Sequence, residues 1–200
     1  MLQASAGFAT LAAMIGVKGE PMNHTPFDPR NDHTAREIRN QLARAFVKLL
    51  EPSADLGPII ELAAHLSYRH PQDVYTEYIK DRQHHYAAAK SDINTQKITD
   101  DFQLALVLWD HQLFFETHEV LESLWKAATG NRKLMLQALI RAAGYYIHLA
   151  SGNRAGAGKM AARACEVLGK YRDELPHIPG LDRLIKCLKD QEAEPPKLLE

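Results

Sequence analysis

The sequence predicts an all-α protein, a multihelical array of about seven helices with a central antiparallel helix pair at residues 113–128 and 132–150. Apolar residues recur at spacings of three and four through most of the chain, and short polar or proline-containing breaks separate these periodic segments. No segment alternates apolar and polar residues with the period of two that marks a half-buried strand. We therefore expect essentially no β-sheet.

The first part of the chain predicts a tail followed by a helical extension. We expect residues 1–32 to be a loosely ordered tail, because their apolar start lacks the basic flank of a secretory signal and prolines interrupt residues 21–29. Helical spacing then predicts helices at 34–51, 59–68 and 72–90, which make up an N-terminal helical extension at 33–90. Pro52, Pro58 and Pro71 stand at the boundaries of these helices.

A polar segment at 90–96 separates this extension from a second helical domain, which we expect at residues 97–190. Its predicted helices lie at 98–109, 113–128, 132–150, 154–171 and 181–188. The connection within the central pair is so short that the two helices should be antiparallel neighbours. Gly152 suits the left-handed end of a helix, and Asn153 suits the start of the next one. Residues 191–200 are expected to form a polar tail.

Composition excludes several classes of function. The chain has 24 Lys and Arg against 25 Asp and Glu, so its formal net charge of −1 gives no global field to attract nucleic acid or an anionic membrane. We therefore expect neither as a partner, and a small molecule or a second copy of the chain remains. Cys165 and Cys187 lack the spacing of a zinc site and are read as reduced thiols in a cytoplasmic protein.

The central helix pair places ionisable groups where an ordinary amphipathic helix has only carbon. A turn of 100° per residue defines one polar face on each helix. On the first helix this face consists of Phe115, His118, Glu119, Glu122 and Trp125. On the second helix it consists of Gln137, Arg141, Gly144 and His148. If the two faces meet, the pair encloses a polar cluster with Phe115, Trp125 and Tyr145 as its walls.

The strings FFETHEVLESLW and LQALIRAAGYYIHLASGNRAGA resemble the bacterial and archaeal helical family called domain of unknown function 309. The resemblance extends over about residues 97–190 and implies a helical fold with a site in the polar cluster, without implying a reaction. The residues on matching positions are Phe115, His118, Glu119, Glu122, Trp125, Gln137, His148, Gly152 and Asn153. Arg141 departs from the pattern, which has an uncharged residue there, and adds a positive charge to any inherited site.

The polar cluster permits three interpretations. The first is a pocket for a small anionic or amide ligand, where His118, Glu119 and Glu122 handle protons. The ligand-binding residues of such a pocket are Phe115, Trp125, Gln137, Arg141, Tyr145 and His148. The second is a buried network that only holds together a non-catalytic interaction or structural module. The third is a metal-dependent hydrolase with His118, Glu122 and His148 as ligands and Glu119 as the base.

The partner of Glu122 distinguishes these interpretations. A carboxylate beside Phe115 and Trp125 is expected to be withdrawn from water, where ionisation is costly without a positive or hydrogen-donating partner. We expect Arg141 or His118 to fill this role, and we expect no bound cofactor, with a divalent metal ion as the alternative. For the same reason we expect the side chain of Trp125 to be buried.

Overall fold

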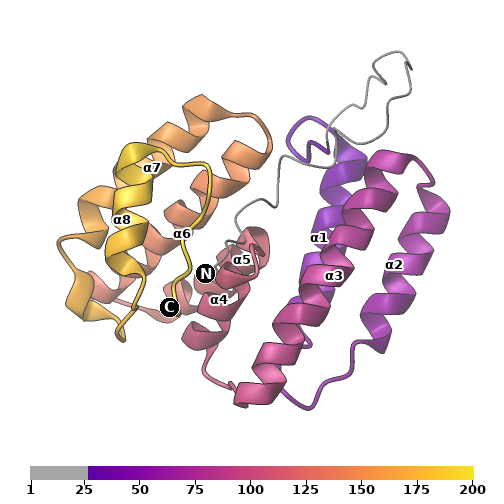
Figure 1. The fold of residues 1–200 in the computed structure, drawn as a ribbon, viewed down its shortest axis with the longest axis horizontal. Coiled ribbons are helices and arrows are strands. Elements are labelled where there is room, and N and C mark those ends of the chain that lie inside the picture. The colour runs from indigo at the N-terminus through magenta and orange to yellow at the C-terminus, as the bar shows by residue number, and fades with distance from the viewer. Residues whose placement is uncertain (1–26) are drawn as a thin grey trace, which may run out of the picture.

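The computed structural model describes residues 27–200, and within that range the chain is α-helical without any strand, which confirms the predicted fold class (Figure 1). Residues 1–26 of the predicted tail lie outside the described residues. The helices are α1 (His33–Val47), α2 (Gly57–Arg69), α3 (Asp73–Gln96), α4 (Asp101–Asp110), α5 (Phe114–Ala127), α6 (Gly130–Ala150), α7 (Arg154–Leu168) and α8 (Leu181–Asp190), with a 3₁₀ turn at Arg172–Glu174.

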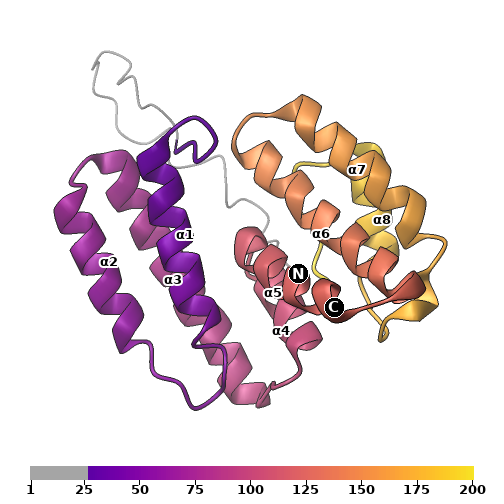
Figure 2. The ribbon, with the colours of Figure 1, turned by 180° about the vertical axis from the view of Figure 1, so that it is seen from behind.

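The helices form two groups that meet at α4 and α5. Helices α1, α2 and α3 pack together on one side of the molecule, and α6, α7 and α8 pack together on the other (Figures 1 and 2). Helix α5 contacts both groups, because it packs against α6 and also against α1. The buried side chains form one continuous core through both groups. The N-terminal extension therefore packs directly on the segment that carries the predicted site.

Two boundaries in the N-terminal group differ from the prediction. Helix α1 ends at Val47 rather than at residue 51, and the buried ammonium of Lys90 donates hydrogen bonds to the carbonyl oxygens of Leu49 and Glu51 in the loop after α1. Helix α3 continues to Gln96, through the segment predicted as a domain boundary, because Ile93 extends its buried face by another turn.

The central helix pair is present and is joined by only two residues, Ala128 and Thr129. Helices α5 and α6 pack against each other, as predicted. Gly130 has a φ of 60°, a left-handed conformation that glycine adopts without steric cost. At the far end of α6, Gly152 has a φ of 68°, and the side chain of Asn153 accepts a hydrogen bond from the Gly156 N–H at 3.1 Å. The left-handed Gly152 at the end of α6 and the Asn153 cap at the start of α7 are thus as the sequence predicted.

The C-terminal segment is polar in composition but packs as a strap across α4 and α6. The Asp110 carboxylate accepts hydrogen bonds from the N–H groups of Leu198 and Leu199 at 2.6 and 3.1 Å. The indole of Trp109 donates to the carbonyl oxygen of Pro196 at 2.9 Å, and Leu198 is buried. Residues 192–199, which we call the C-terminal strap, therefore belong to the folded structure rather than to a free tail.

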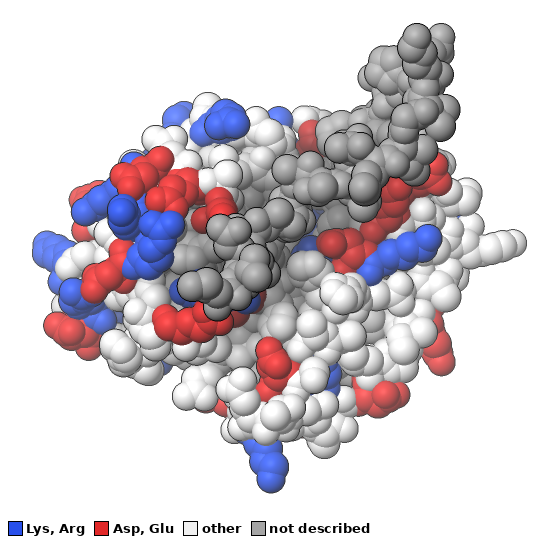
Figure 3. Space-filling model, viewed as in Figure 1, with Lys and Arg blue, Asp and Glu red and all other residues white. Residues whose placement is uncertain are grey.

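Charged side chains of both signs are mixed on the surface. On the face shown in Figure 3, Lys and Arg lie among Asp and Glu, in keeping with the nearly balanced composition. Among residues 27–200, no helix combines the length and the apolar character needed to cross a membrane.

The two tryptophans provide a test of the core. Trp109 is 1% exposed, whereas Trp125 is only half-buried at the edge of the core, so the expectation that Trp125 is buried is wrong. Trp109→Ala should lower the free energy of unfolding by about 3–5 kcal/mol, because it deletes a fully buried aromatic side chain. Trp125→Ala is the matched control and should cost clearly less. Urea unfolding followed by circular dichroism measures both, and equal losses would contradict this packing.

Candidate functional site

A pocket of about 770 Å³ lies where the two helical groups meet. One wall comes from α1, α3 and the turn before α1, and the opposite wall comes from the end of α6, residues 147–151. The start of α5 and the C-terminal strap contribute the remainder through Phe114, Phe115, Ala193 and Pro195. A volume of this size suits a small organic molecule. The pocket thus lies between the N-terminal extension and the predicted site helices, not between α5 and α6.

The charged side chains that line the pocket are basic. They are Arg30, Arg36, Arg39 and Arg82, and no Asp or Glu lies among the described lining residues. A guanidinium group stays protonated in proteins, so each of these side chains keeps its positive charge. Arg82 lies on α3, within the helix predicted at residues 72–90. The other three lie in or just after the predicted tail, where spacing along the chain gives no indication that α1 faces α5.

Arg36 and Arg39 are held by neutral acceptors. Arg36 donates from Nε to the Pro29 carbonyl oxygen at 2.8 Å and from Nη2 to the Arg30 carbonyl oxygen at 2.6 Å. Arg39 donates from Nε and Nη2 to the Asn40 Oδ1 at 3.2 and 2.9 Å. These contacts orient the two guanidinium groups without neutralising them. The turn at 28–31 is therefore fixed onto α1, unlike the loosely ordered tail predicted there.

Aromatic rings support the arginines. The guanidinium carbon of Arg39 lies 3.9 Å from the ring centroid of Phe115, and that of Arg82 lies 5.6 Å from the ring centroid of Tyr78. Cation–π contact of this kind favours the charged groups at a site that is partly withdrawn from water. Burial raises the pKa of Tyr78, so its phenol remains neutral. The aromatic rings therefore stabilise the guanidinium groups without adding a negative charge to the pocket.

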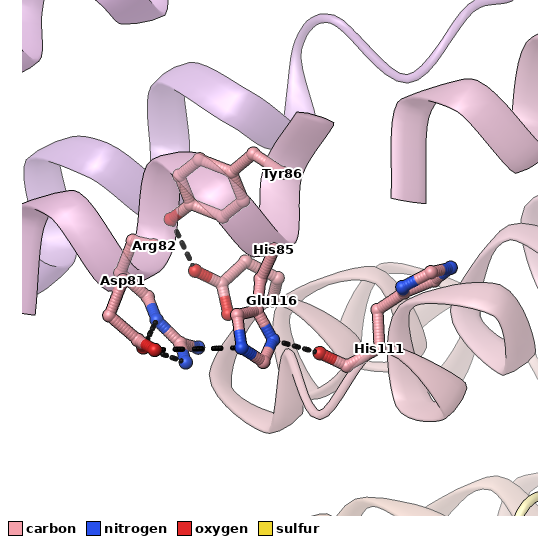
Figure 4. A network of polar contacts seen from close by, with 6 residues as sticks. All are labelled: Asp81, Arg82, His85, Tyr86, His111 and Glu116. Carbon is pink, nitrogen blue, oxygen red and sulfur yellow. Dashed lines mark hydrogen bonds and ion pairs between the residues drawn. The ribbon is translucent and has the colours of Figure 1, made fainter. Parts of the chain in front are cut away.

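A buried carboxylate lies between α3 and α5. Glu116 is 1% exposed, and its Oε1 accepts a hydrogen bond from the Tyr86 hydroxyl at 2.5 Å (Figure 4). Its Oε2 has no hydrogen-bond partner among the described residues. Burial and then the charge of Glu116 raise the pKa of Tyr86, so the phenol keeps the proton that it donates. Nearby, Arg82 donates to the Asp81 carboxylate, and His85 lies 3.5 Å from the same carboxylate.

The sequence contained a signal for Glu116 that helical-wheel reasoning passed over. Glu116 lies three residues after Leu113 and four before Val120, both of which are buried, so it belongs to the core-facing stripe of α5. A carboxylate on such a stripe requires a buried partner. Tyr86 lies on α3, 30 residues earlier, and nothing in the spacing of the sequence identifies it as that partner.

The ionisable side chains on the polar face of α5 form their described ion pairs within α5. His118 Nδ1 lies 3.4 Å from Glu119 Oε1, and Glu122 Oε1 lies 3.1 Å from the ammonium of Lys126. The expectation that Arg141 or His118 neutralises Glu122 is therefore wrong, because Lys126, one turn along the same helix, does so. Phe115 lies parallel to the ring of His118, with the two centroids 6.3 Å apart.

The polar face of α6 does not meet that of α5 in any described hydrogen bond or ion pair. A side chain added at Gly144 would touch Met160 of α7, and one added at Gly156 of α7 would touch His148, so this stripe faces α7. Asn153 Nδ2 lies 2.9 Å from His148 Nδ1, which fixes Nδ1 as the acceptor and leaves Nε2–H as the free donor of the neutral ring. His148 also lines the pocket.

The remaining predicted ligand-binding residues lie apart from one another. Gln137 and Arg141 are half-buried and form no hydrogen bond or ion pair with the described residues. Tyr145 is fully buried, and its hydroxyl donates to the Glu192 carbonyl oxygen at 3.0 Å, so it anchors the C-terminal strap. Trp125 lies under the ammonium of Lys133, 4.6 Å from the ring centroid. Of the predicted site residues, Phe115 and His148 line the pocket.

One group of side chains has the donor atoms of a metal site. Ligand atoms of His118, Glu119 and Glu122 lie within 4.8 Å of one another, and each of these residues is half-buried. His148, the third ligand in the hydrolase interpretation, does not belong to this group. A metal ion held here by His and Glu would share the Glu122 carboxylate with the ammonium of Lys126.

Residues 102–160, from α4 to the middle of α7, match the model of a family described as Domain of unknown function (DUF309). The resemblance seen in the sequence is thereby confirmed for this segment. The match is shorter than the 97–190 expected, and it includes Phe115 and His148 but none of the four pocket arginines. No curated protein and no solved structure shows significant similarity to the chain.

The hydrogen bond between Tyr86 and Glu116 should contribute measurably to stability. Tyr86→Phe leaves both oxygens of a buried carboxyl group without a partner and should lower the free energy of unfolding by about 1.5–3 kcal/mol. Tyr75→Phe removes the same type of bond, from a phenol to the Asp32 carboxylate at 2.6 Å, at a more exposed site, and should cost less. Urea unfolding compares the two variants. An equal or smaller loss for Tyr86→Phe would be contrary to the buried role of Glu116.

Metal content tests the group on α5. Protein purified without chelator and without a metal-binding tag should contain far less than one zinc, manganese or iron ion per chain, because Lys126 already pairs with Glu122. Plasma emission spectrometry measures this directly. About one ion per chain, lost in His118→Ala, would instead identify His118, Glu119 and Glu122 as ligands.

Proposed function

We propose that the protein binds a small organic anion in the pocket between α1, α3, α5 and α6. The observation that supports this most directly is the charge of the lining: four arginines and no described carboxylate. Two of these arginines, Arg36 and Arg39, have only carbonyl or amide oxygens as partners among the described residues. Positive charge that is oriented by the protein but not paired within it favours an anionic ligand.

The partial burial of Arg39 strengthens the proposal. Burial is the main cause that lowers the pKa of Arg39, so withdrawal from water makes its charge less favourable. A guanidinium group cannot relieve this cost by losing its proton, because its pKa remains far above neutrality. An anion bound beside it replaces the lost hydration and converts an unfavourable charge into a charge-assisted hydrogen bond.

The other walls suit an organic body rather than a bare ion. The rings of Phe114 and Tyr146 stack with their centroids 4.9 Å apart, and both residues line the pocket together with the apolar Ile147 and Leu149. Binding pockets for small molecules commonly combine such apolar walls with a few oriented polar groups. The volume of about 770 Å³ leaves room for a body of several carbon atoms beside the arginines.

The proposal does not require the predicted catalytic residues. His118, Glu119 and Glu122 are not among the lining residues, and no described hydrogen bond or ion pair joins them to the pocket arginines. Binding can therefore be measured independently of any reaction. This arrangement favours a ligand-binding protein in which His118, Glu119 and Glu122 lie outside the pocket lining.

Anion binding can be tested with one organic anion and its neutral relative. Benzoate should bind and cause local changes in the ¹H–¹⁵N spectrum around α1 and the end of α6, whereas benzyl alcohol should bind much more weakly. Arg39→Gln should weaken benzoate binding about tenfold or more, since a hydrogen bond to a charged group contributes about 1.5–3 kcal/mol.

Arg44→Gln is the matched control, because Arg44 lies exposed on the same helix and outside the pocket lining. It removes the same charge from α1 and should leave benzoate affinity within about twofold of the unmodified protein. Equal binding of benzyl alcohol, or equal effects of Arg39→Gln and Arg44→Gln, would exclude the proposed site.

A further inference from the structure

We infer that the anion is an organic phosphate monoester with an uncharged, largely apolar body. This inference rests on the proposed function and specifies the ligand class of the same pocket. Three features lead to it: the free donors of the arginines, the convergence of these arginines, and the asymmetry of the two walls.

Three pocket arginines are anchored in the same way. Each of the three donates from Nε and Nη2 to protein oxygens: Arg36 to two backbone carbonyls, Arg39 to the amide oxygen of Asn40, and Arg82 to the carboxylate of Asp81. Among residues 27–200, none of the three Nη1 groups has an acceptor. The anchored edge fixes the plane of each guanidinium group, so both N–H groups of each Nη1 remain as oriented donors.

The three arginines line the same pocket from two helices. Arg36 and Arg39 are three residues apart on α1 and therefore one helical turn from each other on the same face. Burial is the main cause that lowers the pKa of Arg39, and the neighbouring charge of Arg36 lowers it further. Arg82 reaches the same pocket from α3, and all three line it.

This donor set matches a phosphate better than a carboxylate. A carboxylate carries one negative charge on two oxygens, which one or two guanidinium groups saturate. A phosphate monoester carries about −1.5 to −2 charges near neutral pH and presents three terminal oxygens. Arg82 is already partly compensated by Asp81, so the net charge that remains for a ligand comes chiefly from Arg36, Arg39 and the exposed Arg30.

The opposite wall identifies the rest of the molecule. The described lining at the end of α6 is residues 146–151, which include no Lys, Arg, Asp or Glu. A charged body would face no opposite charge on this wall. An uncharged aromatic or aliphatic body packs against Phe114, Ile147 and Leu149, and the free Nε2–H of His148 can donate to an oxygen at its edge.

Three probes separate the possible ligand classes. Isothermal titration calorimetry at one pH and one ionic strength should show that phenyl phosphate binds at least about tenfold more tightly than benzoate and than inorganic phosphate. Benzoate affinity equal to or above that of phenyl phosphate would overturn the phosphate class while leaving the proposed function intact. Inorganic phosphate affinity equal to that of phenyl phosphate would overturn the apolar body. Absence of binding by all three would refute the proposed function itself.

Two variants divide the pocket into its two halves. Ala150→Trp, on the wall formed by the end of α6, should weaken phenyl phosphate at least about tenfold and leave inorganic phosphate unchanged. Arg36→Gln should weaken both probes. Ala162→Trp, an exposed position on α7 outside the lining, should change neither. If Ala150→Trp unfolds in urea like the unmodified protein but loses affinity for phenyl phosphate and inorganic phosphate equally, the end of α6 does not contact the organic body alone, and the inference is overturned.

Discussion

The hydrogen bond between Tyr86 and Glu116 joins the two halves of the molecule beside the proposed pocket. It connects α3 of the N-terminal group to α5, and it is buried on both sides. A carboxylate withdrawn from water in this way depends on the surfaces that cover it. Arg39 and Arg82 lie near enough for Glu116 to raise their pKa values against the effect of burial. The pocket arginines are thus placed beside a negative charge that they do not contact in any described hydrogen bond.

The pocket is built from two parts of the chain, one inside and one outside the segment that matches the family model. The segment that matches the family model contributes Phe115 and the end of α6 to the pocket lining. The arginines come from the turn before α1, from α1 and from α3, all outside that segment. A protein with the matched segment alone would have the apolar wall without the cationic one. The charge selectivity proposed here is therefore a property of how the extension packs on α5.

Sequence reasoning recovered the helices because each one can be read from local spacing. The termination at Gly152 and the cap at Asn153 are of this kind, since both signals lie within a few residues. The predicted end of a helix was wrong where a residue distant in the sequence determines it. Lys90, for example, binds the carbonyl groups of the loop after α1. The two polar faces do not meet for a related reason: a helical wheel predicts which residues share a face but not which helix that face contacts. The stripe with Gly144 and His148 faces α7 instead of α5.

The C-terminal strap determines when the pocket can form during synthesis. Ala193 and Pro195 complete its wall, and they are held there through Trp109, Asp110 and Tyr145, which belong to helices made much earlier. Chains emerge from the ribosome with the N-terminal part first, so α1 to α6 are made before residues 193–198. During that interval the α4 surface under Leu198 is exposed and the wall is open. A complete pocket wall therefore requires residues 193–198 in addition to the two helical groups.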